Sequence, residues 1–169
     1  SAPSVAMHPA RAARVAILHT WSSTPTEGWW RQAFDVAHIP YSYINVQDVA
    51  KNPNLNAKYD VILFPPSGNA QSIVQGMPMW RNPMPWKTTP LTPNMGKLDQ
   101  TDDIRPGLGL AGVQNLEGFV SRGGVLVGVS STADFAIQYG LASGVSANQT
   151  GRGKVVGSLL RTRIVDDAS

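Results

Sequence analysis

The 169-residue chain contains no cysteine. Disulfide bonds, thiolate zinc sites and a cysteine nucleophile are therefore excluded. The chain also lacks an apolar run of about eighteen residues, the length that a membrane-spanning helix needs, and its N-terminal stretch SAPSVAMHPARAAR has no apolar core of a signal peptide. Charged residues make up only 15% of the sequence, and the basic ones are scattered rather than gathered in a stripe. Nucleic acid and a membrane span are therefore not expected for this chain.

Histidine is scarce, because the chain has only His8, His19 and His38. No HExxH or HxxE pair occurs, and no trio of histidine, aspartate and glutamate has the spacing of metal ligands. We therefore expect no metal or other cofactor in this chain. His38 falls at the end of a predicted helix, where it suits the helix dipole. His19 ends a predicted strand, and we favour a structural role for it over the alternative, a catalytic one.

Four short apolar runs predict buried strands at residues 15–19, 41–46, 61–64 and 125–129. Helical patterns separate them, and this alternation predicts a parallel sheet with right-handed crossovers. We therefore predict one flavodoxin-like, doubly wound α/β domain over residues 14–169. Residues 1–13 are predicted to be a disordered lead-in or linker, and residues 154–165 an edge or hairpin strand.

The helices carry recognisable boundary signals. Thr24 is predicted to cap the first helix, Pro25 to open it and Glu27 to complete a capping box, with the helix ending before Pro40. Further helices are predicted at residues 69–75 and 108–122, the latter ended by Gly123 and its glycine neighbour. A last short helix, capped by Thr132, is predicted to end at Gly140.

Residues 77–106 form a long insertion with six prolines, two tryptophans, four methionines and no sustained period. A structureless loop of this length is unusual in a compact domain, and its aromatic content argues against disorder. We predict that the insertion is ordered and packs across the domain, with Trp80 or Trp86 largely buried. The alternative is that Trp80 and Trp86 are stacking platforms for a small ligand or a glycan.

Ser130 lies at the turn between the last predicted strand and the helix that follows, in the sequence GVSST. Ligands of doubly wound sheets bind beyond the carboxyl ends of the strands. The Ser130 turn and the loop PSGN, which contains Gly68 and Asn69, both fall at that edge. A serine there is either a nucleophile or a residue that caps the helix. We therefore take Gly68, Asn69, Ser130, Ser131 and Thr132 as candidate binding residues.

The same residues resemble a known superfamily. The stretch GVSST resembles the nucleophile elbow of class I glutamine amidotransferase-like domains, and PSGN stands where their oxyanion loop follows an earlier strand. ILHTWSSTPTEGWWRQAFD, GMPMWRNPMPWK and STADFAIQYGL resemble, more specifically, the amidotransferase-like domain attached to certain bacterial zinc carboxypeptidases. The resemblance covers most of the chain from residue 14 onward. It implies a secreted or periplasmic parent protein, with zinc held only by the parent's peptidase domain.

The resemblance also bears on whether Ser130 is catalytic. In the superfamily the elbow residue is a cysteine and the base is a histidine later in the chain, whereas no histidine follows Ser130 here. His19 is the only plausible base, so we expect no catalysis. A complete superfamily member continues past such a C-terminus with a last strand and helix, so a truncated chain whose catalytic histidine lies further on stays an alternative.

Three functions follow as hypotheses. The first is a non-catalytic accessory domain of a zinc carboxypeptidase, used for substrate docking, interdomain packing or stability, with the parent's peptidase domain as its partner. The second is a serine-dependent hydrolase or amidotransferase that uses Ser130 with His19. The third is a module that binds a small ligand or a glycan through Trp80 and Trp86. A peptide or a small ligand stays open as a further partner of the chain.

Overall fold

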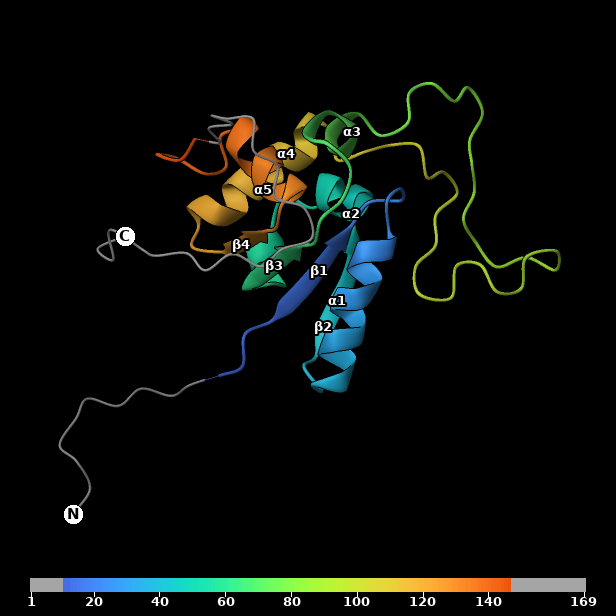
Figure 1. Cartoon of the computed structure of the whole chain (residues 1–169), viewed down its shortest axis with the longest axis horizontal. Coiled ribbons are helices and arrows are strands. Elements are labelled where there is room, and N and C mark those ends of the chain that lie inside the picture. Colours follow the sequence, from blue (N-terminus) through green and yellow to red (C-terminus); the bar gives the residue numbers. More distant parts are fainter. Residues whose placement is uncertain (1–10, 147–169) are drawn as a thin grey trace, which may run out of the picture.

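The computed structural model describes residues 11–146, and these form a single parallel sheet flanked by helices (Figure 1). The strands are β1 (Val15–His19), β2 (Tyr41–Asn45), β3 (Val61–Phe64) and β4 (Val125–Gly128). Their order is β2-β1-β3-β4, and every neighbouring pair is parallel. The four predicted strands are thus confirmed as one sheet. The strand predicted at residues 154–165 and all but residues 11–13 of the predicted lead-in lie outside the described residues.

Helices cover both faces of this sheet. They are α1 (Pro25–Val36), α2 (Val46–Lys51), α3 (Ala70–Gln75), α4 (Gly109–Ser121) and α5 (Ser131–Gln138), with a 3-10 turn at Leu55–Ala57. Figure 1 shows α1 along β1 and β2, apart from the group formed by α2 to α5. The architecture is that of an α/β, doubly wound domain, as the alternation of runs predicted.

The main core lies between the sheet and the helices α2 to α5. It buries one alternate set of strand residues, such as Leu18 and Phe64, against Leu116, Phe119 and Phe135. The opposite face buries Ile17 and Leu63, but at the edge strand β4 the two outward valines, Val125 and Val127, are exposed. The sheet is therefore covered more completely on the face that packs against α4. This packing holds in place the four strand ends that carry the candidate site.

Two helix starts differ from the sequence prediction. Pro25 does open α1, but the side chain of Thr24 makes no capping bond, and the carboxylate of Glu27 contacts Arg31 and Tyr43 instead. The predicted capping box is therefore wrong, because Glu27 is drawn into a buried polar cluster. Val46, predicted as strand, starts the unpredicted helix α2, which Asn45 caps together with the carboxylate three residues on.

An ion pair links the amino-terminal ends of β1 and β3. Its two residues, Arg14 and Asp60, directly precede these strands. The Arg14 guanidinium donates to both carboxylate oxygens of Asp60, at 2.7 and 3.0 Å. The backbone N–H of Arg14 donates to the same carboxylate at 2.8 Å. The hydrogen bonds from Arg14 hold the pKa of Asp60 well below its ordinary value of 3.8.

This pair predicts a pH-dependent contribution to stability. Since the folded state favours the carboxylate of Asp60, the contribution is present above the ordinary pKa of 3.8 and is lost as the pH falls toward the lowered one. Asp60→Asn is expected to lower the free energy of unfolding at pH 7. The difference in unfolding free energy between the variant and the wild type should shrink as the pH drops below 3.8. Urea titrations across pH measure this difference, and a difference that is constant with pH would contradict the assignment.

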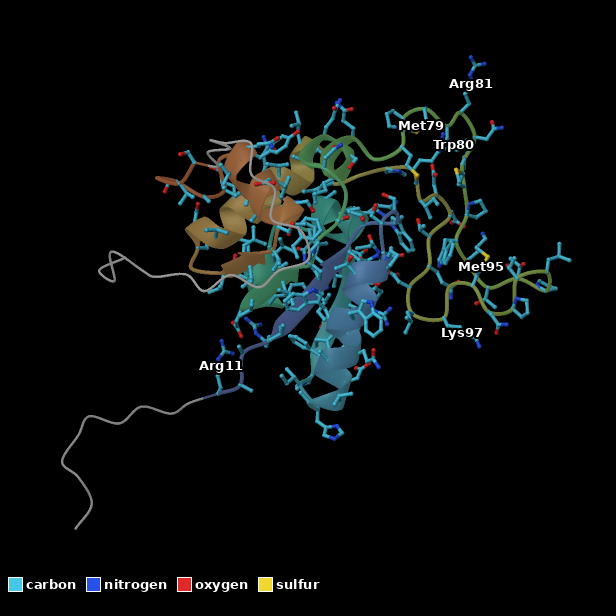
Figure 2. All side chains as sticks on the ribbon, in the orientation of Figure 1. Arg11, Met79, Trp80, Arg81, Met95 and Lys97 are labelled. Atoms are coloured by element: carbon cyan, nitrogen blue, oxygen red, sulfur yellow. The ribbon has the colours of Figure 1, made fainter. Side chains whose placement is uncertain are left out.

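The insertion does not pack across the domain. Figure 1 shows residues 77–106 running out from the sheet and the helices and returning, and within it the structure has only isolated bridges such as Trp86 with Thr101. Trp80 and Trp86 are 55% and 43% exposed, so the predicted burial of either is wrong. The insertion is attached to the domain by its returning half, where Asp99 contacts His19 and Asn45 and the side chain of Gln47 is hydrogen-bonded to Thr101 and Asp103. Many of its large apolar side chains are therefore exposed to solvent rather than buried (Figure 2).

Candidate functional site

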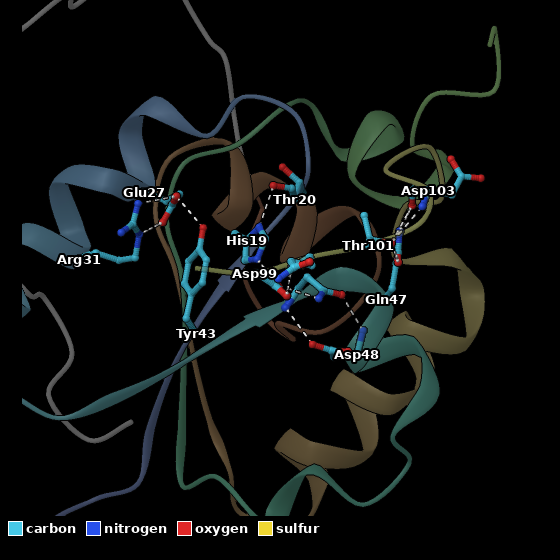
Figure 3. Close-up of polar contacts among 12 residues, drawn as sticks. His19, Thr20, Glu27, Arg31, Tyr43, Gln47, Asp48, Asp99, Thr101 and Asp103 are labelled. Atoms are coloured by element: carbon cyan, nitrogen blue, oxygen red, sulfur yellow. Dashed lines mark hydrogen bonds and ion pairs between the residues drawn. The ribbon is translucent and has the colours of Figure 1, made fainter. Parts of the chain in front are cut away.

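The buried polar residues of the described chain gather at one edge of the sheet. His19 and Thr20 end β1, Asn45 ends β2, Glu27 lies in the first turn of α1 and Thr132 in that of α5. Burial of polar groups costs free energy unless they are hydrogen-bonded. A group of buried polar residues is therefore an informative indicator of a functional site. This is the carboxyl-terminal edge, where doubly wound sheets bind ligands. Figure 3 shows the polar contacts around β1 and β2.

The turn after β4 has the geometry of a nucleophile elbow. Ser130 has φ 56° and ψ −119°, a backbone conformation that side-chain-bearing residues adopt only under strain. Gly128 makes the tight turn possible, because a β-carbon there would lie 2.9 Å from the carbonyl oxygen of Thr132. A strained serine between a strand and a helix is the arrangement that presents a nucleophile in α/β hydrolases. Ser130 is also exposed.

The neighbours of Ser130 have structural roles. Ser130 precedes α5, but its side chain makes no capping bond. Thr132 lies inside the helix rather than before it, so its predicted capping role is wrong. Its buried hydroxyl accepts from the N–H of Val129 at 2.8 Å and donates to the carbonyl of Phe64 at 2.6 Å. Ser131 donates to the Ser67 carbonyl at 2.8 Å and thereby links the elbow to the loop after β3.

That loop has structural hydrogen bonds of its own. The N–H of Ser67 donates to the hydroxyl of Ser131 at 3.1 Å, and Asn69 caps α3 by accepting from the N–H of Ser72 at 2.8 Å. Gly68 packs closely on the side chain of Ser72. The crevice between β1 and β3 is closed by the contact of the Thr20 and Ser67 hydroxyls at 2.6 Å and leaves no room for a water molecule.

His19 is held on both ring nitrogens. Nδ1 contacts the carbonyl oxygen of Thr20 at 3.0 Å, and Nε2 contacts a carboxylate oxygen of Asp99, from the insertion, at 2.9 Å. Both partners are oxygen acceptors, so a ring nitrogen that carries a proton donates to the oxygen that it faces. Asn45 donates to the same carboxylate at 2.8 Å, and the ring of Tyr43 stacks on His19 with centroids 4.1 Å apart. His19 therefore anchors the insertion to the ends of β1 and β2.

A second buried cluster lies beside it. Glu27 accepts from Arg31 Nε at 2.8 Å and from the hydroxyl of Tyr43 at 2.7 Å. Burial, together with that hydrogen bond, raises the pKa of Tyr43 well above its ordinary value of 10.0, so it stays a neutral donor. The hydrogen bond to Glu27 likewise raises the pKa of Arg31. The cluster thus places the carboxylate of Glu27 between the guanidinium of Arg31 and the hydroxyl of Tyr43.

The two clusters and the insertion enclose a cavity of about 220 Å³, which we call the insertion cavity. Trp21, Tyr43 and Glu27 line it from the domain, and Trp86 and Lys97 from the insertion. Neither Ser130 nor Trp80 lines it. The candidate residues therefore lie at two different places. Trp86 and His19 line the same cavity, whereas the Ser130 turn follows β4, on the other side of β3 from β1.

Sequence reasoning missed most of this cavity. Asp99 and Asn45 are 54 residues apart, and Asp99 lies 80 residues from His19. The sequence carries no local signal that would pair residues so far apart. Glu27 carried a signal, its place next to Thr24 and Pro25, but that signal pointed to a helix cap.

No family model, no curated protein and no solved structure matches this chain. Among residues 11–146, no three histidine, aspartate or glutamate side chains are grouped to hold a metal ion. The longest helix of that part, α4, has 13 residues, and none of its helices combines the length and apolar character needed to cross a bilayer.

Proposed function

We propose that this is a non-catalytic domain whose elbow at Ser130 has the backbone of a nucleophile site without the base that would activate it. The observation that carries the proposal is the pairing of His19, whose two ring nitrogens are taken up by Thr20 and Asp99. A working base must reach the serine proton within about 3 Å. Strands β1 and β4 are separated by β3, two spacings of about 4.8 Å. Ser130 thus has no activating partner among the described residues.

Our proposed role is that of an accessory domain, docking or packing against the peptidase domain of a bacterial zinc carboxypeptidase, as the resemblance implies. In support, the insertion carries large exposed apolar side chains, among them Met79, Trp80, Leu91 and Leu98. Exposed apolar side chains that form a contiguous patch mark interaction surfaces, and in this proposal those of the insertion form such a patch. In this proposal zinc belongs to the peptidase domain, and the parent is periplasmic or secreted.

The absence of catalysis is tested by turnover. Wild-type protein and Ser130→Ala are expected to hydrolyse an activated ester, an amide and glutamine no faster than buffer, because an unactivated hydroxyl lacks the roughly 10²–10⁴-fold that positioned proton transfer supplies. Ser131→Ala is the matched control for the loss of a neighbouring hydroxyl. Turnover by wild type that Ser130→Ala abolishes and Ser131→Ala retains would establish the serine-hydrolase alternative instead.

A further inference from the structure

The insertion cavity has the features of a binding site, and it stands apart from the Ser130 turn. It lies at the ends of β1 and β2 and is closed on one side by the insertion, which Asp99 ties to His19 and Asn45. Its volume of about 220 Å³ is below the range of roughly 300–1,000 Å³ usual for drug-sized ligands. The space therefore suits a single small ring or one residue of a polymer.

The charged side chains that line the insertion cavity are of both signs, with two carboxylates, Glu27 and Asp99, and two cations, Arg31 and Lys97. Glu27 pairs with Arg31, and Asp99 contacts His19. Lys97 is the remaining lining cation, and no ion pair to another described residue forms there. A cationic ligand would face Arg31 and Lys97, and an anionic ligand would face the carboxylates of Glu27 and Asp99, each at a cost in desolvation. The lining therefore favours a neutral ligand.

Two further observations specify the chemistry of that ligand. The indole N–H of Trp21 is buried and has no hydrogen-bond partner among the described residues. That nitrogen is fully buried, so a ligand in the cavity does not reach it, and the indole ring is the part of Trp21 that lines the cavity. Trp86, which is 43% exposed, and the ring of Trp21 add aromatic surface to the lining. Aromatic faces beside a few fixed polar groups suit a ring with both C–H faces and hydroxyl edges.

We infer that the insertion cavity binds one neutral, hydroxyl-rich ring, that is, a single sugar residue free or within a glycan. The inference goes beyond the proposed accessory role and does not depend on Ser130. Trp86 stacks on the ring, the indole of Trp21 adds a second aromatic surface, and the Glu27–Arg31 pair offers an acceptor and donors to hydroxyls. The sugar is thus recognised by the domain and by the insertion together.

The test uses the full chain, with binding followed by the indole N–H signals in NMR titrations. The probes are neutral hexoses and N-acetylhexosamines, together with glucosamine and glucuronate, which match the glucose ring and add a positive or a negative charge. We expect at least one neutral ring to bind in the millimolar range and to shift the signals of Trp21 and Trp86, with the charged analogues roughly tenfold weaker. No binding by any neutral ring up to about 50 mM, or tighter binding of a charged analogue, would overturn the inference.

Variants locate the binding. Trp86→Ala is expected to weaken the affinity for the best neutral probe by roughly five- to tenfold, whereas Trp80→Ala, which removes an exposed tryptophan of the same insertion outside the cavity, leaves it unchanged. Equal losses in the two variants would place the ligand elsewhere and contradict the assignment. Ser130→Ala is expected to bind the best neutral probe as the wild type does. The binding test and the turnover test of Ser130 can therefore fail independently of each other.

Discussion

Replacing Arg31 with methionine is expected to destabilise the folded domain by about 2–4 kcal/mol. The reason is the carboxylate that stays behind: Glu27 is 5% exposed and accepts a 2.8 Å hydrogen bond from Arg31. Removal of one partner of a buried pair leaves an uncompensated charge, which costs more than the pair contributes. We place the value below that for a fully buried pair because 21% of the Arg31 side chain is exposed. Urea unfolding at pH 7 measures the change.

The partner substitution gives the control. Glu27→Gln leaves Arg31 free to turn toward water, and the double variant has no buried charge at this position. We therefore expect both to be more stable than Arg31→Met alone, with coupling between the two sites of about 1–3 kcal/mol. Additive effects in this double-mutant cycle would show that the pair is not coupled and that Glu27 is solvated in the folded protein.

Replacing Thr132 with valine is expected to cost about 2–4 kcal/mol. Its hydroxyl, on a residue only 1% exposed, is the partner of two backbone groups, the N–H of Val129 and the carbonyl of Phe64. Valine has nearly the same shape but no hydroxyl, so it leaves a buried donor and acceptor unpaired at about 1–3 kcal/mol each. The loss should appear as a lower midpoint in chemical denaturation with an unchanged slope.

The matched variant is Thr132→Ser, which keeps the hydroxyl and deletes one methyl group. We expect it to cost about 1 kcal/mol, well below the valine variant, since only a small apolar group is lost. If valine were tolerated better than serine, the methyl packing and not the hydrogen bonds would hold the turn, and the position of the Ser130 elbow would need another explanation.

The strands were predictable because their signal is local. A parallel strand covered on both faces appears as a short continuous apolar run, and Val15–His19 and Val61–Phe64 are such runs. Helix α2 was missed because it has six residues and starts directly after a strand, although Asn45 and Asp48 carried the signature of a capping box. The doubled glycine at Gly123 predicted the end of α4 for the same local reason.

The site was less predictable because its contacts are distant in sequence. The elbow could be inferred from Gly128 and Ser130, whose spacing reflects one tight turn. The insertion cavity could not, since it depends on the path by which a proline-rich segment returns to place Asp99 against His19. Aromatic content alone does not predict the exposure of Trp80 and Trp86, because it indicates that a segment makes contacts without specifying whether they are to the domain or to a ligand.

The central claim, that Ser130 is not an activated nucleophile, is tested most directly by covalent trapping. A fluorophosphonate reacts with an activated serine and adds a defined mass to the intact protein. We predict that the mass of the native wild-type chain stays unchanged after incubation, because the two nitrogens of His19 are held by Thr20 and Asp99. A single added label on Ser130, formed by the wild type and lost in His19→Ala, would contradict the account and identify a serine-dependent enzyme.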